Sequence, residues 1–150
     1  MGYTEKNFQN EFKDRNKMVG VFELKICKLK SLPFSSIAEH QRDSLLKISS
    51  EQGLYHKISD VPVSEMDNNN RRKIRFTKKK PFDCFFLNLM PADVVIMFYQ
   101  PRVKKDVYYI PIKRFLETEK ESDRKSITEE MASEVAYFKT SYLKQGGKND

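Results

Sequence analysis

Cysteine and histidine are scarce in this chain, and their scarcity excludes several classes of site. Only two cysteines occur, Cys27 and Cys84, and neither has a second cysteine or a histidine at the spacing of a metal-binding motif. A disulfide framework and a zinc site are therefore not indicated. The two histidines, His40 and His56, lack a recognisable serine or cysteine nucleophile as partner, so histidine acid–base chemistry is a secondary hypothesis.

Long apolar runs are also missing. No stretch approaches the roughly 20 apolar residues of a membrane-spanning helix, and the first residues lack the apolar core of a signal peptide. No predicted helix combines a basic polar face with a bulky apolar face, which disfavours a protein that binds anionic membranes. We therefore expect a cytoplasmic protein without a membrane partner.

The residues that are present describe a basic globular chain. Its 150 residues fit one domain, expected over residues 1–144, with a disordered tail over residues 145–150. The 28 Lys and Arg outnumber the 21 Asp and Glu, which gives a net charge of +7 and a pI near 9.3. This excess favours polyanionic partners, but it does not choose between nucleic acid, an anionic membrane and simple solubility.

Hydrophobic periodicity predicts both helices and strands. Strands are predicted over residues 18–28, 54–58, 82–87, 94–99 and 107–112. The strand over 94–99 reads as internal to the sheet, and Pro111 predicts that the last strand is an edge. Short helices are predicted over residues 4–14 and 113–119. The segment 64–72 predicts a loop, and the basic segment 71–80 predicts an exposed strand or hairpin arm.

Two further helices are predicted from capping boxes, formed by Ser36 with Glu39 and by Ser126 with Glu129. The stripe of the first helix, which ends near Gly53, is Ile37, Gln41, Leu45 and Ile48. The stripe of the second helix is Met131, Val135, Phe138 and Tyr142.

The chemistry-bearing residues lie on the strand over residues 18–28. Side chains alternate along a strand, so Glu23 and Lys25 project from one face about 7 Å apart. A carboxylate there can bind a divalent cation through hard oxygen ligands, and the ammonium can orient a water or offset phosphate charge. An ordinary ion pair at a sheet edge explains the same two residues.

Gln41 lies on the apolar stripe of the following helix, and a buried amide needs hydrogen-bonding partners. If this helix packs over the strand, Gln41 reaches the site of Glu23 and Lys25 and fixes a water or backbone group there. The alternative is a glutamine that extends from the rim of the core.

Several short motifs then occur in a recognisable order. Phe22-Glu23-Leu24-Lys25 is followed by Leu32-Pro33-Phe34, by Glu39-His40-Gln41, and later by Asp106-Val-Tyr-Tyr-Ile-Pro111 and Asp123-Arg-Lys-Ser-Ile127. Together these motifs resemble the recombination protein U family of Holliday junction resolvases, within the PD-(D/E)XK nuclease superfamily. The resemblance implies an α/β fold, restriction-endonuclease-like, with a mixed central sheet flanked by helices. It also implies a phage-encoded protein that acts in a bacterial host cell.

One residue is missing from the place that the family gives it. Family members carry a metal-binding aspartate on a strand before the Glu-x-Lys strand, for which this chain has no room. Asp83, within Lys80-Pro-Phe-Asp-Cys-Phe-Phe86, resembles the proline-acid start of that strand, displaced along the chain, and Asp60 is its rival. If the strand of Asp83 pairs beside that of Glu23, both carboxylates converge on one metal ion. Asp83 is otherwise a strand-opening acid in solvent.

The resemblance also implies roles for the remaining candidates. Glu5 matches the N-terminal helix acid of archaeal resolvases, although an acid there is also an ordinary helix-dipole partner. Mg²⁺ or Mn²⁺ held by Glu23 and Asp83 would polarise the scissile phosphate, and Lys25 would position the attacking water or stabilise charge. Gln41 and Glu5 complete the expected catalytic set.

The expected function is therefore a metal-dependent, structure-selective DNA endonuclease that resolves four-way junctions by phosphodiester hydrolysis as a homodimer. A flap-processing or end-processing nuclease of the same superfamily and a catalytically degenerate DNA-binding protein are the alternatives. Basic residues beside loops and strand ends suit phosphate contacts to branched double-stranded DNA. The expected contacts are Lys28, Lys30, Arg71, Arg72, Lys73, Arg75, Lys78, Lys79, Lys80, Arg124 and Lys125, and Lys104 and Lys105 form a further basic pair.

Overall fold

The computed structural model describes residues 2–58, 62–66, 68–76 and 83–144. Its helices are α1 (Glu5–Arg15), η1 (Phe34–Ser36, a 3-10 turn), α2 (Glu39–Ser49), α3 (Ile112–Glu121) and α4 (Glu129–Val135). Its strands are β1 (Val21–Cys27), β2 (Ser31–Pro33), β3 (Leu54–Lys57), β4 (Pro62–Met66), β5 (Arg72–Phe76), β6 (Cys84–Leu87), β7 (Ala92–Gln100), β8 (Lys104–Pro111), β9 (Ser126–Thr128) and β10 (Phe138–Ser141).

The central sheet has the strand order β1-β7-β8-β10. β1 runs parallel to β7, whereas β8 is antiparallel to both β7 and β10. The fold is therefore mixed α/β with a mixed central sheet, as expected. β7 is buried on both faces from Ala92 to Phe98, because its run is apolar apart from Asp93 and neighbouring strands pair with both of its edges. The prediction of an internal strand here is confirmed.

The two faces of the sheet carry separate apolar cores. On one face, side chains from α2, α3 and α4 pack with Val94, Ile96 and Phe98 of β7. On the other face, Phe8 and Phe12 of α1 pack with Val95 and Met97 of the same strand. Val21 belongs to the first core and Phe22 and Leu24 belong to the second. By this alternation Glu23 and Lys25 belong to the α2 side.

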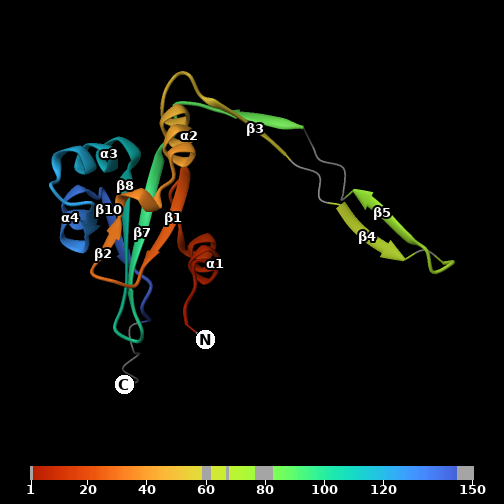
Figure 1. Cartoon of the computed structure of the whole chain (residues 1–150), viewed down its shortest axis with the longest axis horizontal. Helices are drawn as coiled ribbons and strands as arrows, with labels where there is room; N and C mark the ends of the chain where they lie inside the picture. The colour runs from red at the N-terminus through yellow and green to blue at the C-terminus, as the bar shows by residue number, and fades with distance from the viewer. Residues whose placement is uncertain (1, 59–61, 67, 77–82, 145–150) are drawn as a thin grey trace.

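A ribbon and a hairpin extend away from the sheet. β3 and β6 form a two-stranded antiparallel ribbon, and β4 and β5 form a hairpin; together these four strands are called the arm. Figure 1 shows the hairpin at the far end of the arm. The arm begins at Gly53, whose φ of +68° and contact with the Phe86 ring leave no room for a Cβ atom. The predicted strand near residues 54–58 and the predicted arm over 71–80 are confirmed for the described residues.

The predicted capping box of Ser36 with Glu39 is wrong in its N-cap residue. Ser36 ends the η1 turn and its hydroxyl donates to the Pro33 carbonyl, so Ala38 is the N-cap of α2 instead. Gln41 supplies the missing cap contact, because its Oε1 accepts a hydrogen bond of 2.9 Å from the Ala38 N–H. The position of Gln41 is therefore set by the helix start itself.

The second helix is much shorter than its stripe predicted. Thr128, not Ser126, caps α4, because residues 126–128 pair as β9 with β2. The helix ends at Val135, and Phe138–Ser141 pairs with β8. The open edge of β8 can pair with an extended segment there, so tertiary pairing overrides the helical spacing.

Three other predictions meet different outcomes. β8 is not an edge strand, because β10 pairs with it up to Tyr109 and Pro111 lies beyond that pairing. The predicted loop over 64–72 is largely a hairpin with a turn at residues 68–70. The predicted tail over 145–150 lies outside the described residues. Within the described part of the chain, no helix is long and apolar enough to span a membrane.

Arg42 anchors α2 to the rest of the fold, and its replacement tests how far that helix depends on it. Arg42 donates to the carbonyls of Ile37 and Phe34 and pairs with Glu119 of α3. We expect Arg42→Met to lower the free energy of unfolding by about 2 kcal/mol, because the Ile37 carbonyl loses the guanidinium donor, the Phe34 carbonyl keeps only the Ile37 N–H, and the ion pair with Glu119 is lost. Urea denaturation measures the change.

Asp43→Asn is the matched control for Arg42→Met. Asp43 pairs with Lys47 at 2.9 Å within the same helix, and the Asp43 side chain is 59% exposed. Its replacement should cost less than about 0.5 kcal/mol. Equal costs for the two variants would show that Arg42 is not an anchor.

Candidate functional site

Glu23, Lys25 and Gln41 converge on one face of the sheet. The Gln41 amide donates a hydrogen bond of 2.9 Å to Oε1 of Glu23, and Lys25 Nζ lies 3.4 Å from the same oxygen. The side chains of Glu23 and Lys25 are 25% and 18% exposed, so both are sheltered but reachable from solvent. The expected approach of Gln41 to the Glu-x-Lys strand is present, with Glu23 and the Ala38 N–H as its two partners.

Two neighbouring elements hold this arrangement in place. Parallel pairing sets Glu23 opposite Val94 and Lys25 opposite Ile96, two fully buried residues of β7. On the α2 side of the sheet, the Ala38 N–H at the start of α2 holds Gln41 by its Oε1 atom. The amide nitrogen of Gln41 is then directed at Glu23. One oxygen of the Glu23 carboxylate is therefore held by a hydrogen bond from Gln41 and an ion pair with Lys25.

A carboxylate held in this way can offer oxygen to a hard cation, with an ammonium beside it for an anionic substrate. It is nevertheless a single carboxylate. Among the described residues, no group of three or more His, Cys, Asp or Glu side chains could hold a metal ion. A metal at Glu23 would need a further acidic ligand or the oxygens of a bound phosphate.

The structure does not bring Asp83 to Glu23 within one chain. Asp83 is exposed and lies just before β6, which pairs with β3 rather than with β1, so the expected pairing beside the Glu23 strand is not formed. Its backbone carbonyl accepts from the Ile58 N–H. Asp60 lies outside the described residues. Glu5 is half-buried in the first turn of α1, on the opposite side of the sheet from α2.

The two histidines do not join this group of side chains. His40 is exposed on α2 next to Gln41. His56 is exposed on β3, where its ring lies 5.0 Å from that of Phe85. Neither is part of the contacts around Glu23, and acid–base chemistry by a histidine stays secondary.

The predicted DNA contacts fall into three places. Lys28 and Lys30 are exposed past the end of β1 and line a hollow of about 400 Å³ with Lys104, which is paired with Glu129. Arg124 and Lys125 are exposed before β9. Arg71 and Arg72 are exposed at the β4–β5 hairpin, whose β5 also contains Lys73 and Arg75. Lys78, Lys79 and Lys80 lie outside the described residues.

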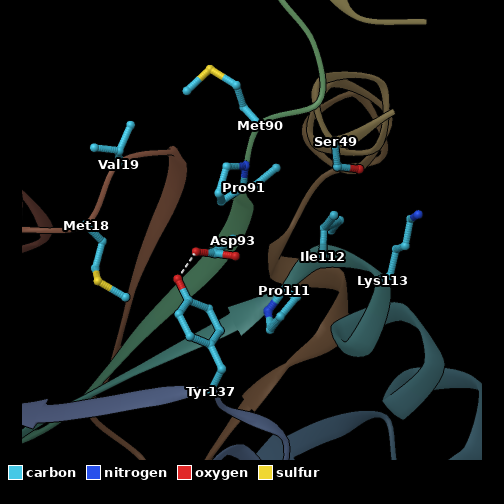
Figure 2. Close-up of a pocket in the computed structure, with 11 residues that line it drawn as sticks. Met18, Val19, Ser49, Met90, Pro91, Asp93, Pro111, Ile112, Lys113 and Tyr137 are labelled. Carbon is cyan, nitrogen blue, oxygen red and sulfur yellow. Dashed lines mark hydrogen bonds between the residues drawn. The ribbon is translucent and has the colours of Figure 1, made fainter. Parts of the chain in front are cut away.

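Sequence reasoning missed a cavity at the end of the sheet. It has a volume of about 360 Å³, and Figure 2 shows the Asp93 carboxylate among its lining, hydrogen-bonded to the Tyr137 hydroxyl. Asp93 is 2% exposed and is the one buried charged residue in the described part of the chain. Burial raises the pKa of Asp93, and the Tyr137 hydrogen bond opposes that shift. The sequence signal for this cavity was Asp93 itself, an acidic residue inside the otherwise apolar run of β7.

The buried Asp93 predicts a specific pH dependence of stability. Because its pKa is raised in the folded state, folded protein keeps this proton to a higher pH than unfolded protein does. The resulting stability is complete below the unfolded pKa, about 3.9, and is lost as pH rises through the folded pKa. Asp93→Asn stays neutral, so wild type should lose stability relative to this variant over that interval. Urea denaturation at a series of pH values measures it.

A constant difference between wild type and Asp93→Asn across the acid range would contradict the prediction. Asp43→Asn, an exposed aspartate on α2, serves as the control for surface charge.

The Gln41–Glu23 contact predicts coupling between the two positions. Gln41→Leu and Glu23→Ala should be non-additive by about 1 kcal/mol in unfolding free energy, since either change alone removes the same hydrogen bond. Gln41→Glu keeps an oxygen for the Ala38 N–H but replaces the amide donor with a carboxylate that repels Glu23, so its cost adds like-charge repulsion to the lost hydrogen bond. Urea denaturation of the double-mutant cycle measures the coupling.

Gln41→Leu combined with Glu51→Ala provides the control cycle, because Glu51 is exposed beyond the end of α2. That pair should be additive within about 0.5 kcal/mol. Additivity in both cycles would mean that the Gln41–Glu23 hydrogen bond contributes nothing to the fold.

Comparison with known proteins does not assign this chain to a family. No family model, curated protein or solved structure matches it. A functional proposal therefore rests on the chemistry and geometry of the Glu23 site.

Proposed function

We propose that this protein is a metal-dependent DNA endonuclease of the PD-(D/E)XK type that acts on four-way junctions. The observation that carries the proposal is the convergence of Gln41, from the helix after the strand, on the carboxylate of Glu23 and beside Lys25. A strand with Glu-x-Lys and a helix with His-Gln are the motifs that resemble the junction resolvases, and here they meet in space.

The arrangement of elements around the site also supports a restriction-endonuclease-like core. α2 follows β1 along the chain and covers one face of the sheet, β1 runs parallel to β7, and α1 covers the opposite face. This makes Glu23 and Lys25 residues of an outer strand of the sheet within the described residues.

Each residue then has a chemical task. Mg²⁺ or Mn²⁺ would supply charge stabilisation and activation of water at the scissile phosphate. Glu23 offers a hard oxygen ligand, and Mg²⁺ is commonly bound through one or two carboxylates together with substrate phosphates. Lys25 donates to a phosphate oxygen or to the attacking water, while Gln41 orients the Glu23 carboxylate. The phosphorus–3′-oxygen bond breaks as the water oxygen bonds to phosphorus.

The distribution of basic residues favours shape over sequence as the property recognised. Lys28 and Lys30 extend beyond β1, whereas Arg71 and Arg72 lie on the projecting arm. Phosphate contacts at separated places orient a nucleic acid without reading its bases. A branched duplex, which spreads its backbones over a wide surface, suits this distribution.

One observation favours a second candidate, a DNA-binding protein of the same fold without catalysis. The described residues of a single chain place one carboxylate at the Glu-x-Lys strand and no group of three metal-ligating side chains. Such a protein would bind junctions through the same basic residues but would not cleave them.

Cleavage of a labelled four-way junction tests the proposal. Wild type with Mg²⁺ or Mn²⁺ should produce paired nicks, and Glu23→Ala or Lys25→Ala should slow cleavage by about 100-fold or more while junction binding is retained. Gel electrophoresis of the products and a mobility-shift assay measure the two properties.

Lys139→Ala is the matched control, since Lys139 is exposed on β10 at the other edge of the sheet. It should cleave at the wild-type rate. Linear duplex and flap substrates test structure selectivity, and preferential cleavage of flaps would indicate end processing instead. Binding without metal-dependent cleavage of any DNA would leave the non-catalytic candidate.

A further inference from the structure

The outer edge of β1 is open in the described part of the chain. β1 pairs with β7 along its seven residues and with no other described strand. The helices α1 and α2 cover the two faces of this strand but not its edge. An open edge presents unpaired N–H and C=O groups, and natural proteins rarely leave a long one uncovered. This edge therefore offers a place for another strand.

A hollow lies beside the same edge. It has a volume of about 270 Å³ and opens between α1 and β1. Its lining residues are Gln9, Phe12, Lys13, Phe22, Glu23 and Leu24. The Phe12 and Phe22 rings meet edge to face at 5.2 Å and form the aromatic part of this lining. The hollow has room for a large side chain beside the two rings, and Glu23 of the proposed active site is among its lining residues.

The β3–β6 ribbon carries large aromatic side chains that are exposed and could enter such a hollow. Tyr55 is 75% exposed and Phe86 is 43% exposed, with ring centroids 4.9 Å apart. A two-stranded ribbon is marginally stable by itself in water, and paired aromatics on its surface indicate a surface that becomes covered. Asp83 immediately precedes this exposed strand.

We propose that β6 of a second copy of this chain pairs with the open edge of β1, seats Phe86 in the hollow and places Asp83 beside Glu23. This inference rests on the proposed nuclease function for its consequence, because Asp83 then becomes the second acidic ligand. The metal site is thereby shared between two chains.

The alternation of side chains fits this arrangement. In an extended strand Phe86 and Asp83 point to opposite faces, about 10 Å apart along the strand. The hollow lies on the α1 side, so seating Phe86 there turns Asp83 toward the α2 side, where Glu23 lies. Parallel pairing with Phe86 opposite Leu24 sets Asp83 opposite Val21. Antiparallel pairing with Phe86 opposite Phe22 sets it opposite Lys25.

A second copy, rather than the same chain, supplies the strand. Within one chain β6 continues into β7, and the connection is fixed to α2 by hydrogen bonds from the Leu89 N–H to Ser50 and from the Met90 N–H to Ile48. Figure 1 shows the ribbon leading away from the sheet. Two chains related by a two-fold axis can exchange arms, so that each contact is made twice.

Disulfide trapping tests the contact without any activity. The strand pairing sets Cys84 on the same face as Phe86, near Gln9 and Lys13, and Cys84 is an exposed free thiol. Mild oxidation of Gln9→Cys or Lys13→Cys should give a covalent dimer on a non-reducing gel, abolished by Cys84→Ser. Lys139→Cys, on the edge strand β10, is the matched control and should remain monomeric.

Two results of this trapping would overturn the proposal. An internal disulfide that leaves the chain monomeric would mean that β6 folds back within its own chain. Covalent dimers that form equally well from Lys139→Cys would mean that the contacts are random collisions.

Mixed dimers test the shared site. Glu23→Ala and Asp83→Ala should each be inactive alone, but their mixture should recover about a quarter of the wild-type cleavage rate, because half of the dimers contain one intact site. No recovery, with both variants still dimeric, would overturn the shared site. If wild type itself does not cleave, the nuclease function fails while the trapping result still decides the strand exchange.

Discussion

Burial of β7 on both faces is the constraint on which the rest of the structure depends. The strand gives Val94, Ile96 and Phe98 to the core under α2, α3 and α4, and Val95 and Met97 to the core under α1. A one-residue slip would exchange these two sets of side chains, so the register of β7 is strongly determined. Because β1 pairs with this strand, the places of Glu23 and Lys25 are determined with it.

Gln41 connects the start of a helix with the chemistry of a strand. One end of its amide satisfies the Ala38 N–H and the other end reaches Glu23. The side chain that orients the carboxylate therefore also stabilises the first turn of α2, which Arg42 holds against Phe34 and Ile37. Packing, capping and the site share the same few residues.

Local pattern was sufficient for most of the elements. The apolar alternation of β1, the continuous apolar run of β7 and the spacing of Phe8 and Phe12 in α1 each depend on neighbours close in sequence. The face shared by Glu23 and Lys25, and the approach of Gln41, followed from the same periods.

Features that depend on distant pairing were not predictable in this way. Phe138 continues a helical stripe but lies in a strand, because β8 has an edge that it can pair with. Ser36 has the spacing of a cap but belongs to the η1 turn. The strand that follows Asp83, β6, pairs with β3, and hydrogen bonds from residues 89 and 90 to the end of α2 hold the base of this pair. Asp93, inside an apolar strand, depends on Tyr137 far along the chain.

The attachment of the arm has a mechanical consequence. The ribbon is bonded at its base to the last turns of α2, through the carbonyls of Ile48 and Ser50. A helix of this length is a stiff element, so the base of the ribbon holds a fixed position relative to the opposite end of α2. The opposite end of that helix carries Gln41, whose amide steers the Glu23 carboxylate. The base of the ribbon and the residue that orients the Glu23 carboxylate are thus joined by one rigid helix.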